Sequence, residues 1–426
     1  MKPRFAIPLF VFSLGYPDSR PIAAEGFPPL QVEQITFGPK HHYYGYIGHV
    51  GNIPWNRSGR YLVALRTDFQ DRLPAPDEAA EIVLLDASRE YRVTVLDRTL
   101  AWNPQQGTML YWNPEAPETQ FFFNDRDPET GKPFCVLYDL SAGDPGRRIK
   151  EYRFDDTPIG NSGVRWKGGS FLGVNYARLA RLRPVTGYPE AYDWTVGVNR
   201  PEDDGVFLVD AASGEKRLLV SYRRMADALR PSRPDVDDRA LFINHTLWNR
   251  DCDRIYFFAR ADFETKERID APFTIRPDGT GLTLHERHIG GHPEWAEGRL
   301  LVGRDGDNQI LYDTDSQSIV GTLGDPSILP KPEGDIALSP DGDVLVNGFG
   351  AGGRNYYAFY RRSDGAHARS EGFDRNGWVK GPLRLDPAPC WNRTGDRIVF
   401  PAIANDPERT RQMFQLKFGA VGEERE

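Results

Sequence analysis

Hydrophobic and polar residues alternate along this chain in short runs that are typical of β-strands. Five of the runs share one beginning: a hydrophobic residue, a polar tetrad that usually contains Asp or Asn and Gly, and then an apolar strand. The five tetrads follow Trp55, Trp248, Trp295, Leu338 and Trp391. Asp, Asn and Gly supply the dihedral angles of tight turns, and the flanking residues favour strands. Each motif therefore predicts a strand, a tight turn and a returning strand.

Strand units that recur every few dozen residues are typical of β-propellers, in which each blade is a four-stranded sheet. With one unit at the centre of each blade, the sequence predicts seven blades, which span residues 50–99, 100–150, 160–222, 240–284, 289–324, 333–372 and 383–420. We therefore expect an all-β chain, a seven-bladed β-propeller of antiparallel blades around a central axis. Residues 31–46 are left over, and we expect them to complete the last blade and close the ring. One short helix is predicted at Met225–Leu229.

The first residues of the chain have the pattern of a secretory signal. Lys2 and Arg4 precede an apolar run, and small residues follow at Ala23 and Ala24. We expect residues 1–24 to be a signal peptide and residues 25–426 to form a single propeller domain. The protein is then periplasmic or secreted, and a cytoplasmic location is the alternative. The apolar run is too short to span a membrane, and no other segment is long or apolar enough.

Composition narrows the possible partners. The net charge of −8 gives no basic field for nucleic acid, so an acidic substrate would need a local basic pocket. Aromatic residues make up 12% of the chain, as expected where rings fill the space between sheets. The cysteines Cys135, Cys252 and Cys390 lie far apart without a CxxC spacing, which predicts reduced, buried thiols.

One position in each blade is expected to face the central axis. Three residues before the hydrophobic anchor of each turn, the blades carry in order Asn52, Met109, Gly163, His245, His292, Asp335 and Ala388. Equivalent positions share a strand face, because side chains alternate with a period of two. Three successive blades thus bring together His245, His292 and Asp335, with Glu333 on the same face. Two imidazoles and one or two carboxylates are typical ligands of a divalent metal ion, here Mn or Zn. The alternative is that the histidines are hydrogen-bonded structural residues.

Two further clusters could contact a substrate. His41, His42 and Tyr44 precede the first blade. They either anchor this segment by hydrophobic packing or form a wall of the site that stacks on sugars and transfers protons. Asn175–Arg183 is rich in arginine, and if it is a strand, Arg181 and Arg183 share one face and Arg178 does not. Paired arginines suit carboxylate or sulfate recognition, and the alternative is plain surface charge. Gln106 lies in a polar turn whose groups could bind sugar hydroxyls or cap a strand.

Several motifs can be set aside. Residues 348–353 match GxGxxG, but a strand-like segment follows instead of a helix, so the dinucleotide interpretation fails. The chain has no GxSxG elbow, which excludes the peptidase half of propeller-bearing serine peptidases. No Walker A sequence is present, and HERH at 285–288 is one residue short of HExxH.

Blocks in a fixed order along the chain resemble a known group. HHYYGYIGHVGNIPWNRSGRYLVALRTDFQDRLP, TLAWNPQQGTMLYWNP, FFFNDRD, NYARLARLRPVTGYP, FINHTLWNRD and RLDPAPCWNRTGDRI together look like the seven-bladed propellers of oligogalacturonate lyases and ulvan lyases, over roughly residues 31–420. Oligogalacturonate lyases hold Mn through several His and a Gln and use an Arg as the base, whereas ulvan lyases of this fold use His, Tyr and Arg. The chain departs from the former at Glu333-Gly334-Asp335, where that family has Gln and two His.

The resemblance implies a polysaccharide lyase that cleaves uronic-acid-containing glycans by metal-assisted β-elimination. The expected metal ligands are His245, His292, Asp335 and Glu333. Arg181 and Arg183 would bind the uronate or supply the base, and His42 with Tyr188 would be acid and base partners. The expected substrate contacts are His41, Tyr44, Arg178 and Gln106.

Two other classes of function remain open. A non-catalytic propeller that binds glycans or proteins is the main alternative. A glycoside hydrolase would need two carboxylates about 5–10 Å apart, whereas Glu333 and Asp335 share a strand. The partner we expect is an acidic poly- or oligosaccharide, and the chain is expected to be a monomer or a weak homo-oligomer.

Overall fold

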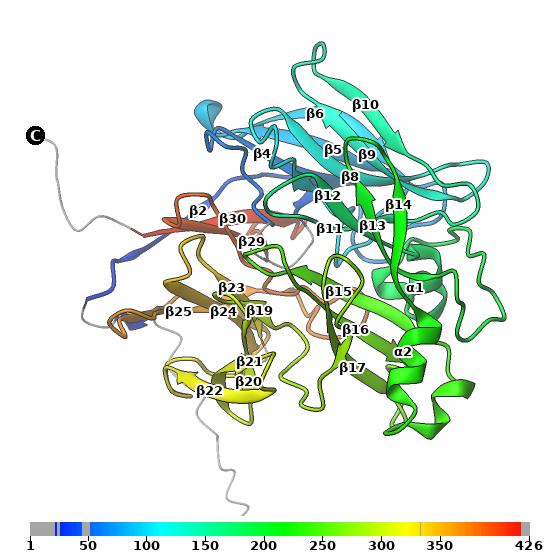
Figure 1. Ribbon diagram of the computed structural model, residues 1–426. Coiled ribbons are helices and arrows are strands. Elements are labelled where there is room, and N and C mark those ends of the chain that lie inside the picture. The colour runs from blue at the N-terminus through cyan, green and yellow to red at the C-terminus, as the bar shows by residue number, and fades with distance from the viewer. Residues whose placement is uncertain (1–21, 24–25, 45–51, 333, 419–426) are drawn as a thin grey trace, which may run out of the picture.

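The computed structural model describes residues 22–23, 26–44, 52–332 and 334–418. These residues form seven antiparallel sheets that follow one another around a central axis (Figure 1). The predicted seven-bladed β-propeller is therefore confirmed. None of the helices in the described residues is long and apolar enough to cross a membrane.

Each blade is one sheet, and its strands follow one another from the axis outward. Blade one contains β3 (His41–Tyr43), β4 (Tyr61–Thr67), β5 (Ala80–Asp86) and β6 (Arg92–Thr99). Blade two contains β7 (Tyr111–Trp112), β8 (Gln120–Arg126), β9 (Pro133–Asp139) and β10 (Arg147–Tyr152). Blade three contains β11 (Gly160–Val164), β12 (Ser170–Val174), β13 (Gly205–Asp210) and β14 (Lys216–Ser221). Blade four contains β15 (Phe242–Trp248), β16 (Ile255–Ala261), β17 (Ile269–Ile275) and β18 (Thr283–Leu284).

The remaining three blades complete the ring. Blade five contains β19 (Glu294–Trp295), β20 (Leu300–Asp305), β21 (Asn308–Asp313) and β22 (Ser318–Leu323). Blade six contains β23 (Asp335–Leu338), β24 (Val344–Ala351), β25 (Arg354–Arg361) and β26 (His367–Arg369), with β27 (Phe373–Asp374) paired to β25 and β1 (Ile22–Ala23) paired to β26. Blade seven contains β28 (Cys390–Trp391), β29 (Arg397–Ile403), β30 (Arg411–Phe418) and β2 (Leu30–Gln34).

The ring closes through the N-terminal segment, as the sequence predicts. Strand β2 pairs antiparallel with β30 and so supplies the outermost strand of blade seven. Only the first part of residues 31–46 has this role, because His41–Tyr43 form the innermost strand of blade one. The predicted signal peptide stays a prediction, since most of residues 1–24 lie outside the described residues, and β1 lies near its end.

Tryptophans at the ends of four innermost strands join neighbouring blades. The indole nitrogens of Trp112, Trp248, Trp295 and Trp391 each donate a hydrogen bond to a backbone carbonyl of the preceding blade, at distances of 2.7, 3.2, 3.0 and 3.1 Å. Arg393 of blade seven in turn donates from Nε to the carbonyl of Trp55 in blade one, at 3.1 Å. A buried indole N–H needs a partner of this kind, so the repeated motif both forms the turn and holds adjacent blades together.

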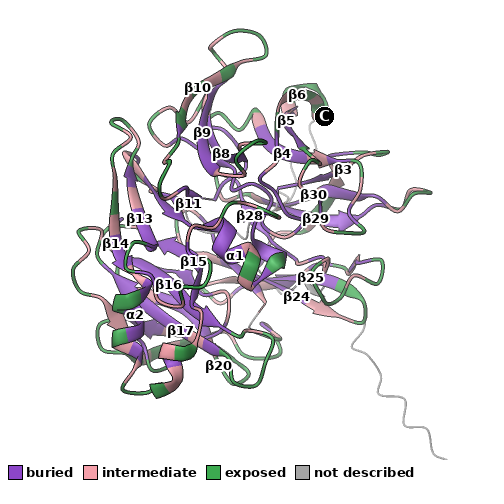
Figure 2. Ribbon diagram, turned by 90° about the vertical axis from the view of Figure 1, so that its right-hand side faces the viewer, coloured by how far each residue is buried: buried purple, intermediate pink, exposed green. Residues whose placement is uncertain are grey.

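Hydrophobic side chains fill the space between the blades. Every residue of β15 and β16 is buried, whereas the outer strand β10 alternates between exposed and covered positions. Figure 2 shows the same pattern, with buried strands and exposed loops. Cys135, Cys252 and Cys390 are free and buried, which confirms the prediction for the thiols.

The described residues contain two α-helices. Helix α2 (Tyr222–Leu229) confirms the helix predicted at Met225–Leu229 and begins three residues earlier. The arginine-rich segment was expected to be a strand, and this expectation is wrong, because it forms helix α1 (Tyr176–Leu182). The side chain of Asn175 caps this helix by accepting a hydrogen bond from the backbone N–H of Arg178 at 2.9 Å, and the Ala and Leu residues that follow favour helix.

Candidate functional site

The position expected to face the axis has an unusual backbone in three blades. Met109, His245 and Ala388 have φ angles of 56°, 55° and 40°, in the left-handed region that residues other than glycine rarely adopt. At His245 the pairing of β15 with β16 shifts register between Asn244 and Leu247. Strained backbone of this kind is frequent at functional sites. The equivalence deduced from the repeat thus has a counterpart in the local backbone.

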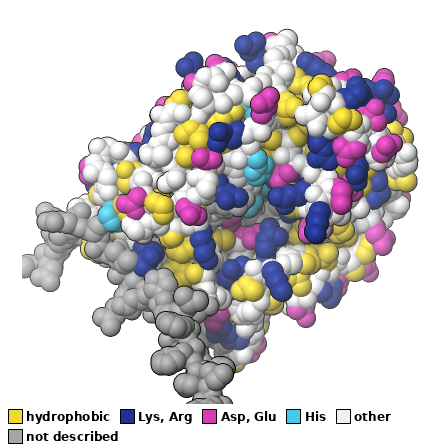
Figure 3. Space-filling model, turned by 90° about the horizontal axis from the view of Figure 1, so that it is seen from below, with side chains coloured by type: hydrophobic (Ala, Val, Ile, Leu, Met, Phe, Trp, Pro, Cys, Tyr) yellow, Lys and Arg dark blue, Asp and Glu magenta, His cyan; other side chains and the backbone are white. Residues whose placement is uncertain are grey.

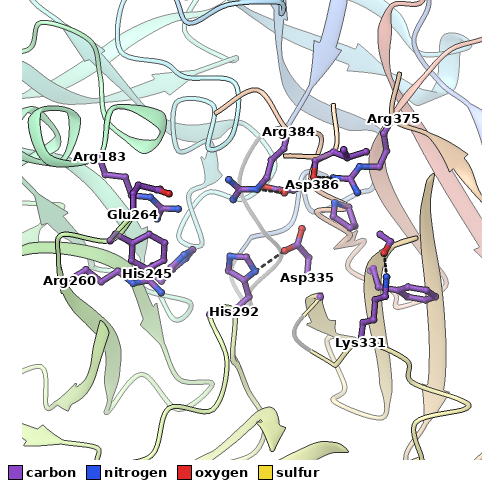
Figure 4. Close-up of a pocket in the computed structure, with 18 residues that line it drawn as sticks. Arg183, His245, Arg260, Glu264, His292, Lys331, Asp335, Arg375, Arg384 and Asp386 are labelled. Carbon is purple, nitrogen blue, oxygen red and sulfur yellow. Dashed lines mark hydrogen bonds and ion pairs between the residues drawn. The ribbon is translucent and has the colours of Figure 1, made fainter. Parts of the chain in front are cut away.

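Three of the predicted side chains lie together at the axis. The rings of His245 and His292 meet nearly edge to face, with centroids 5.0 Å apart. Nδ1 of His292 lies 2.9 Å from Oδ1 of Asp335 (Figure 4). Blades four, five and six therefore bring two imidazoles and one carboxylate into a single cluster.

Asp335 fixes both the imidazole of His292 and the loop that follows blade six. Its Oδ2 accepts a hydrogen bond from the backbone N–H of Ala388 at 2.8 Å, and only 3% of the residue is exposed. Burial alone would raise the pKa of Asp335, but the hydrogen bond and the charge interaction with His292, together with the bond from Ala388, lower it below its ordinary value. A carboxylate can only accept, so it keeps the proton on Nδ1 of His292 and leaves Nε2 as the nitrogen that can take a proton.

The same hydrogen bonds bear on the predicted metal ion. Both carboxylate oxygens of Asp335 already accept hydrogen bonds, from His292 and from Ala388. Within the part of the chain that the structure describes, no three His, Cys, Asp or Glu side chains are placed to hold a metal ion. Glu333, the fourth predicted ligand, lies outside the described residues. The described side chains therefore do not form a complete ligand set, and the metal ion stays a prediction.

A cavity of about 580 Å³ opens over this cluster. Its basic lining residues are Arg183, Arg260, Lys331, Arg375 and Arg384, and its acidic ones are Glu264, Asp335 and Asp386. The space-filling view shows histidine side chains in a central hollow with basic side chains around it (Figure 3). The cavity has more basic than acidic side chains, although the whole chain has a net charge of −8. The local basic pocket that an acidic ligand would require is present.

Arg183 is the most unusual cation of the cavity. It follows helix α1, is only 8% exposed, and lies over the ring of Phe263 with 4.4 Å between Cζ and the ring centroid. No carboxylate of the described residues forms an ion pair with it, and its Nε has no hydrogen-bond partner among them. Burial, followed by repulsion from Arg260 and Arg384, lowers its pKa to about 10. The charges of Glu264 and Asp270 offset part of this effect without forming an ion pair. A buried guanidinium without an ion-pair partner is costly, so an anionic ligand would be favoured beside it.

Arg384 and Asp386 lie between Arg183 on one side of the cavity and Arg375 on the other (Figure 4). Nε of Arg384 is 2.8 Å from Oδ1 of Asp386. Burial and the neighbouring charge of Asp335 raise the pKa of Asp386, and Arg384 opposes this effect. The two carboxylates of the axis thus have opposite pKa shifts, because one is hydrogen-bonded to an imidazole and the other is repelled by the first.

The other predicted arginines lie outside the cavity. Nε of Arg181 is 2.8 Å from Oδ2 of Asp193 on a partly exposed face of α1. Arg178 is fully buried and lies over the ring of Tyr222. Its guanidinium donates to the carbonyls of Leu241, Val198 and Asn199 and to the hydroxyl of Thr195. Arg178 therefore holds the long loop after α1 in place.

The predicted acid and base partners lie in the core. Tyr188 is fully buried, stacks on Tyr176 with ring centroids 4.4 Å apart, and accepts a hydrogen bond from Asn124 at 2.7 Å. Burial raises the pKa of its hydroxyl well above the ordinary value. Nδ1 of His42 is 2.9 Å from Oε1 of Gln412, and burial lowers the pKa of this imidazole to about 4. Neither side chain is among those that line the cavity.

The predicted substrate contacts are also distributed over the fold. Nδ1 of His41 accepts a hydrogen bond from the backbone of Arg411 at 3.0 Å, and the hydroxyl of Tyr44 donates to the carbonyl of Leu110 at 2.6 Å. Gln106 lines a small neighbouring cavity, which shares His245 and His292 with the large one. Of the four predicted contacts, which include Arg178 described above, Gln106 is the one that lies beside the site.

Several cavity residues were not predicted from the sequence. They are Arg260, Lys331, Arg375, Arg384 and Asp386. Arg384 and Asp386 fall inside the block RLDPAPC, which carried part of the resemblance, so that block was an available signal. Arg260 lies near the end of β16, and Lys331 and Arg375 lie in loops that have no equivalent from blade to blade.

Comparisons with known proteins show similarity at the level of solved structures. No protein-family model matches the sequence, and a search of curated proteins gives no match. The chain is similar to TolB from Acinetobacter baumannii, with 11% identity over 84% of this chain and 80% of that one and a TM-score of 0.39. It is also similar to the β-propeller domain of the Trilobed protease from Pyrococcus furiosus, with 12% identity over 88% of this chain and 95% of that one and a TM-score of 0.46. For a luciferin-regenerating enzyme the identity is 10% over 76% of this chain and 92% of that one, with a TM-score of 0.39. Similarity at these levels says nothing about activity, and the architecture rests on the strand pairing.

Proposed function

We propose that the chain is a polysaccharide lyase that cleaves uronic-acid-containing glycans by β-elimination in the axial cavity. The observation that carries the proposal is the combination of a carboxylate-bound imidazole, His292 on Asp335, with a buried guanidinium, Arg183, that has no carboxylate partner among the described residues. An elimination next to a carboxylate needs both: a cation that neutralises the carboxylate, and a base for the adjacent proton.

The side chains of the cavity can divide the reaction between them. Arg183 and Arg384 bind the uronate carboxylate and stabilise the negative charge that develops on it, which acidifies the C5 proton. Nε2 of His292 takes that proton, and Asp335 stabilises the imidazolium that forms. The electron pair of the C5–H bond becomes the C4=C5 double bond, and the C4–O bond breaks. His245, beside His292, donates a proton to the leaving oxygen.

A divalent metal ion, Mn or Zn, remains part of the wider hypothesis. Such an ion would supply further neutralisation of the uronate carboxylate. His245 and His292 are the described side chains that would hold it, and they do not complete a ligand set. The arginines of the cavity provide the same neutralisation from the protein itself.

The proposal is tested by incubating the protein with pectic oligomers, ulvan and alginate while following the absorbance of the unsaturated product. We expect product from at least one of them, and we expect His292→Ala to lower the rate by about 100-fold or more, as for loss of a general base. The matched control is His367→Ala, because His367 lies on the outer strand β26. Absence of product from the whole panel, or a His292→Ala variant as fast as the control, would refute the proposal. Tight binding of the same glycans without product would instead indicate a non-catalytic binding propeller.

A further inference from the structure

The axial cavity has two basic ends on either side of the His292–Asp335 pair. Figure 4 shows Arg183, Arg260 and Glu264 at one end and Arg375 and Lys331 at the other. The pair of Arg384 and Asp386 lies between them. The proposed reaction uses Arg183 and Arg384, so the end with Arg375 and Lys331 has no role in it.

Arg375 resembles Arg183 in its surroundings. It is 9% exposed, and its Nη2 donates to the carbonyl of Val379 at 3.1 Å. Its Nε has no hydrogen-bond partner among the described residues, and no described carboxylate forms an ion pair with it. Burial lowers its pKa below the ordinary value. This second guanidinium is therefore also held in the cavity wall with unused hydrogen-bonding capacity.

The backbone of β24 is shaped for this arginine. A Cβ on Gly350 would lie 2.4 Å from Nη1 of Arg375, so the absence of a side chain lets the guanidinium rest against the strand. The carbonyl of Gly350 accepts a hydrogen bond from Nζ of Lys331 at 2.5 Å. The remaining wall at this end is apolar, with Phe349 and Val379. Arg375 and Lys331 thus lie beside one strand, against an apolar surface.

We propose that Arg375 and Lys331 form a second anion subsite, separate from that of Arg183 and Arg384. The cavity then selects glycans in which the sugars on both sides of the cleaved linkage carry an anionic group. This inference rests on the proposed function for the position of the linkage, over His292. The physical reason is that a buried guanidinium gains more from an anionic ligand than an exposed one, because it has already lost its water.

The inference can be tested by binding, without turnover. The probes are an unbranched uronate disaccharide with both carboxylates free and the same disaccharide with one carboxylate as a methyl ester, each titrated calorimetrically into the His292→Ala protein. We expect the diacid to bind about 10- to 100-fold more tightly than the monoester, the range for hydrogen bonds to a charged group. Adding Arg375→Gln, which removes the guanidinium charge and keeps a polar side chain, should reduce this preference to about threefold or less.

The matched control is Arg354→Gln in the same background. Arg354 is an exposed arginine of β25 whose Nη1 donates to the carbonyl of Gly372 at 2.9 Å. This variant should keep the full preference for the diacid. An Arg375→Gln protein that folds, as judged by circular dichroism, and keeps the same preference as the Arg354→Gln control would overturn the inference.

Failure of the proposed function would look different. If the protein never cleaves uronates, but Arg375→Gln removes its preference for the diacid, the second subsite is supported and the lyase activity is refuted. Cleavage that is equally fast for diacid and monoester would support the lyase and refute the second subsite. If neither disaccharide binds, both are refuted.

Discussion

Asp335 offers the sharpest perturbation of the site, because it joins two parts of it. Its oxygens accept one hydrogen bond from Nδ1 of His292 at 2.9 Å and one from the backbone of Ala388 at 2.8 Å. Asp335→Asn keeps the shape and removes the charge. The amide oxygen can still accept a hydrogen bond, but the amide nitrogen can only donate. Either His292 or the backbone N–H of Ala388 then faces this nitrogen as a second donor, or His292 changes its tautomer. In the second case the proton moves to Nε2, the nitrogen proposed to act as the base.

The magnitude follows from the hydrogen bonds. Two bonds to a buried carboxylate contribute about 1.5–3 kcal/mol each, and one neutral bond of about 1 kcal/mol remains in the variant. The neutral amide avoids the cost of burying a charge, which offsets part of the loss. We therefore expect the free energy of unfolding to fall by about 2 kcal/mol at pH 7. Activity should fall more, by about 10²- to 10⁴-fold, because the base is in the wrong tautomer.

The pH dependence has a definite sign. The folded-state pKa of Asp335 lies below the ordinary value of 3.8, so its stabilisation is complete above that value and is lost as the pH falls through the folded-state pKa. The difference in unfolding free energy between wild type and Asp335→Asn should therefore shrink as the pH falls below about 4.

Equilibrium unfolding in urea, followed by tryptophan fluorescence at several pH values, measures this difference. The control is Asp155→Asn, because the side chain of Asp155 is 95% exposed and its change should leave stability as it was. An Asp335→Asn protein as stable as the control at pH 7, or a difference that grows as the pH falls below about 4, would refute the reasoning.

Three further predictions test other parts of the structure. Gly348→Ala places a Cβ 2.5 Å from Cβ of Pro387 in the cavity wall, so we expect the free energy of unfolding in urea to fall by about 2 kcal/mol. The control is Gly321→Ala, whose Cβ would lie 3.8 Å from Leu311. Equal stability of the two variants would contradict the packing. Trp391→Phe removes the indole donor to Ala337 between blades six and seven and should cost about 1–2 kcal/mol, measured as a lower unfolding temperature; an unchanged temperature would speak against the inter-blade bond. If the predicted metal ion binds, elemental analysis of the purified protein should give close to one Mn or Zn per chain, with stability lost on chelation; protein nearly free of metal that does not respond to added ions would end that hypothesis.

The repeated turns made the architecture predictable. A turn motif around Trp55, Trp248 or Trp391 is local, and its residues determine turn and strands without reference to distant parts of the chain. The segment after Asn175 was misassigned because alternating arginines fit a strand as well as a helix face. The cap by Asn175 was the available signal for the helix.

The site was partly predictable for the same reason. His245, His292 and Asp335 were found because they occupy equivalent positions in successive blades. Arg375 and Arg384 lie in an irregular segment between blades six and seven, where no repeat defines an equivalent position. Burial also separates residues of identical chemistry, as with Arg178, whose donors are used within the core, and Arg183, which reaches the cavity.

Mass spectrometry of the products tests the central claim most directly. Elimination breaks the glycosidic bond without adding water, so uronate oligosaccharides should give an unsaturated sugar and a second fragment whose masses together equal that of the intact oligosaccharide. Two saturated fragments, whose masses together exceed it by one water, would show hydrolysis and contradict the account.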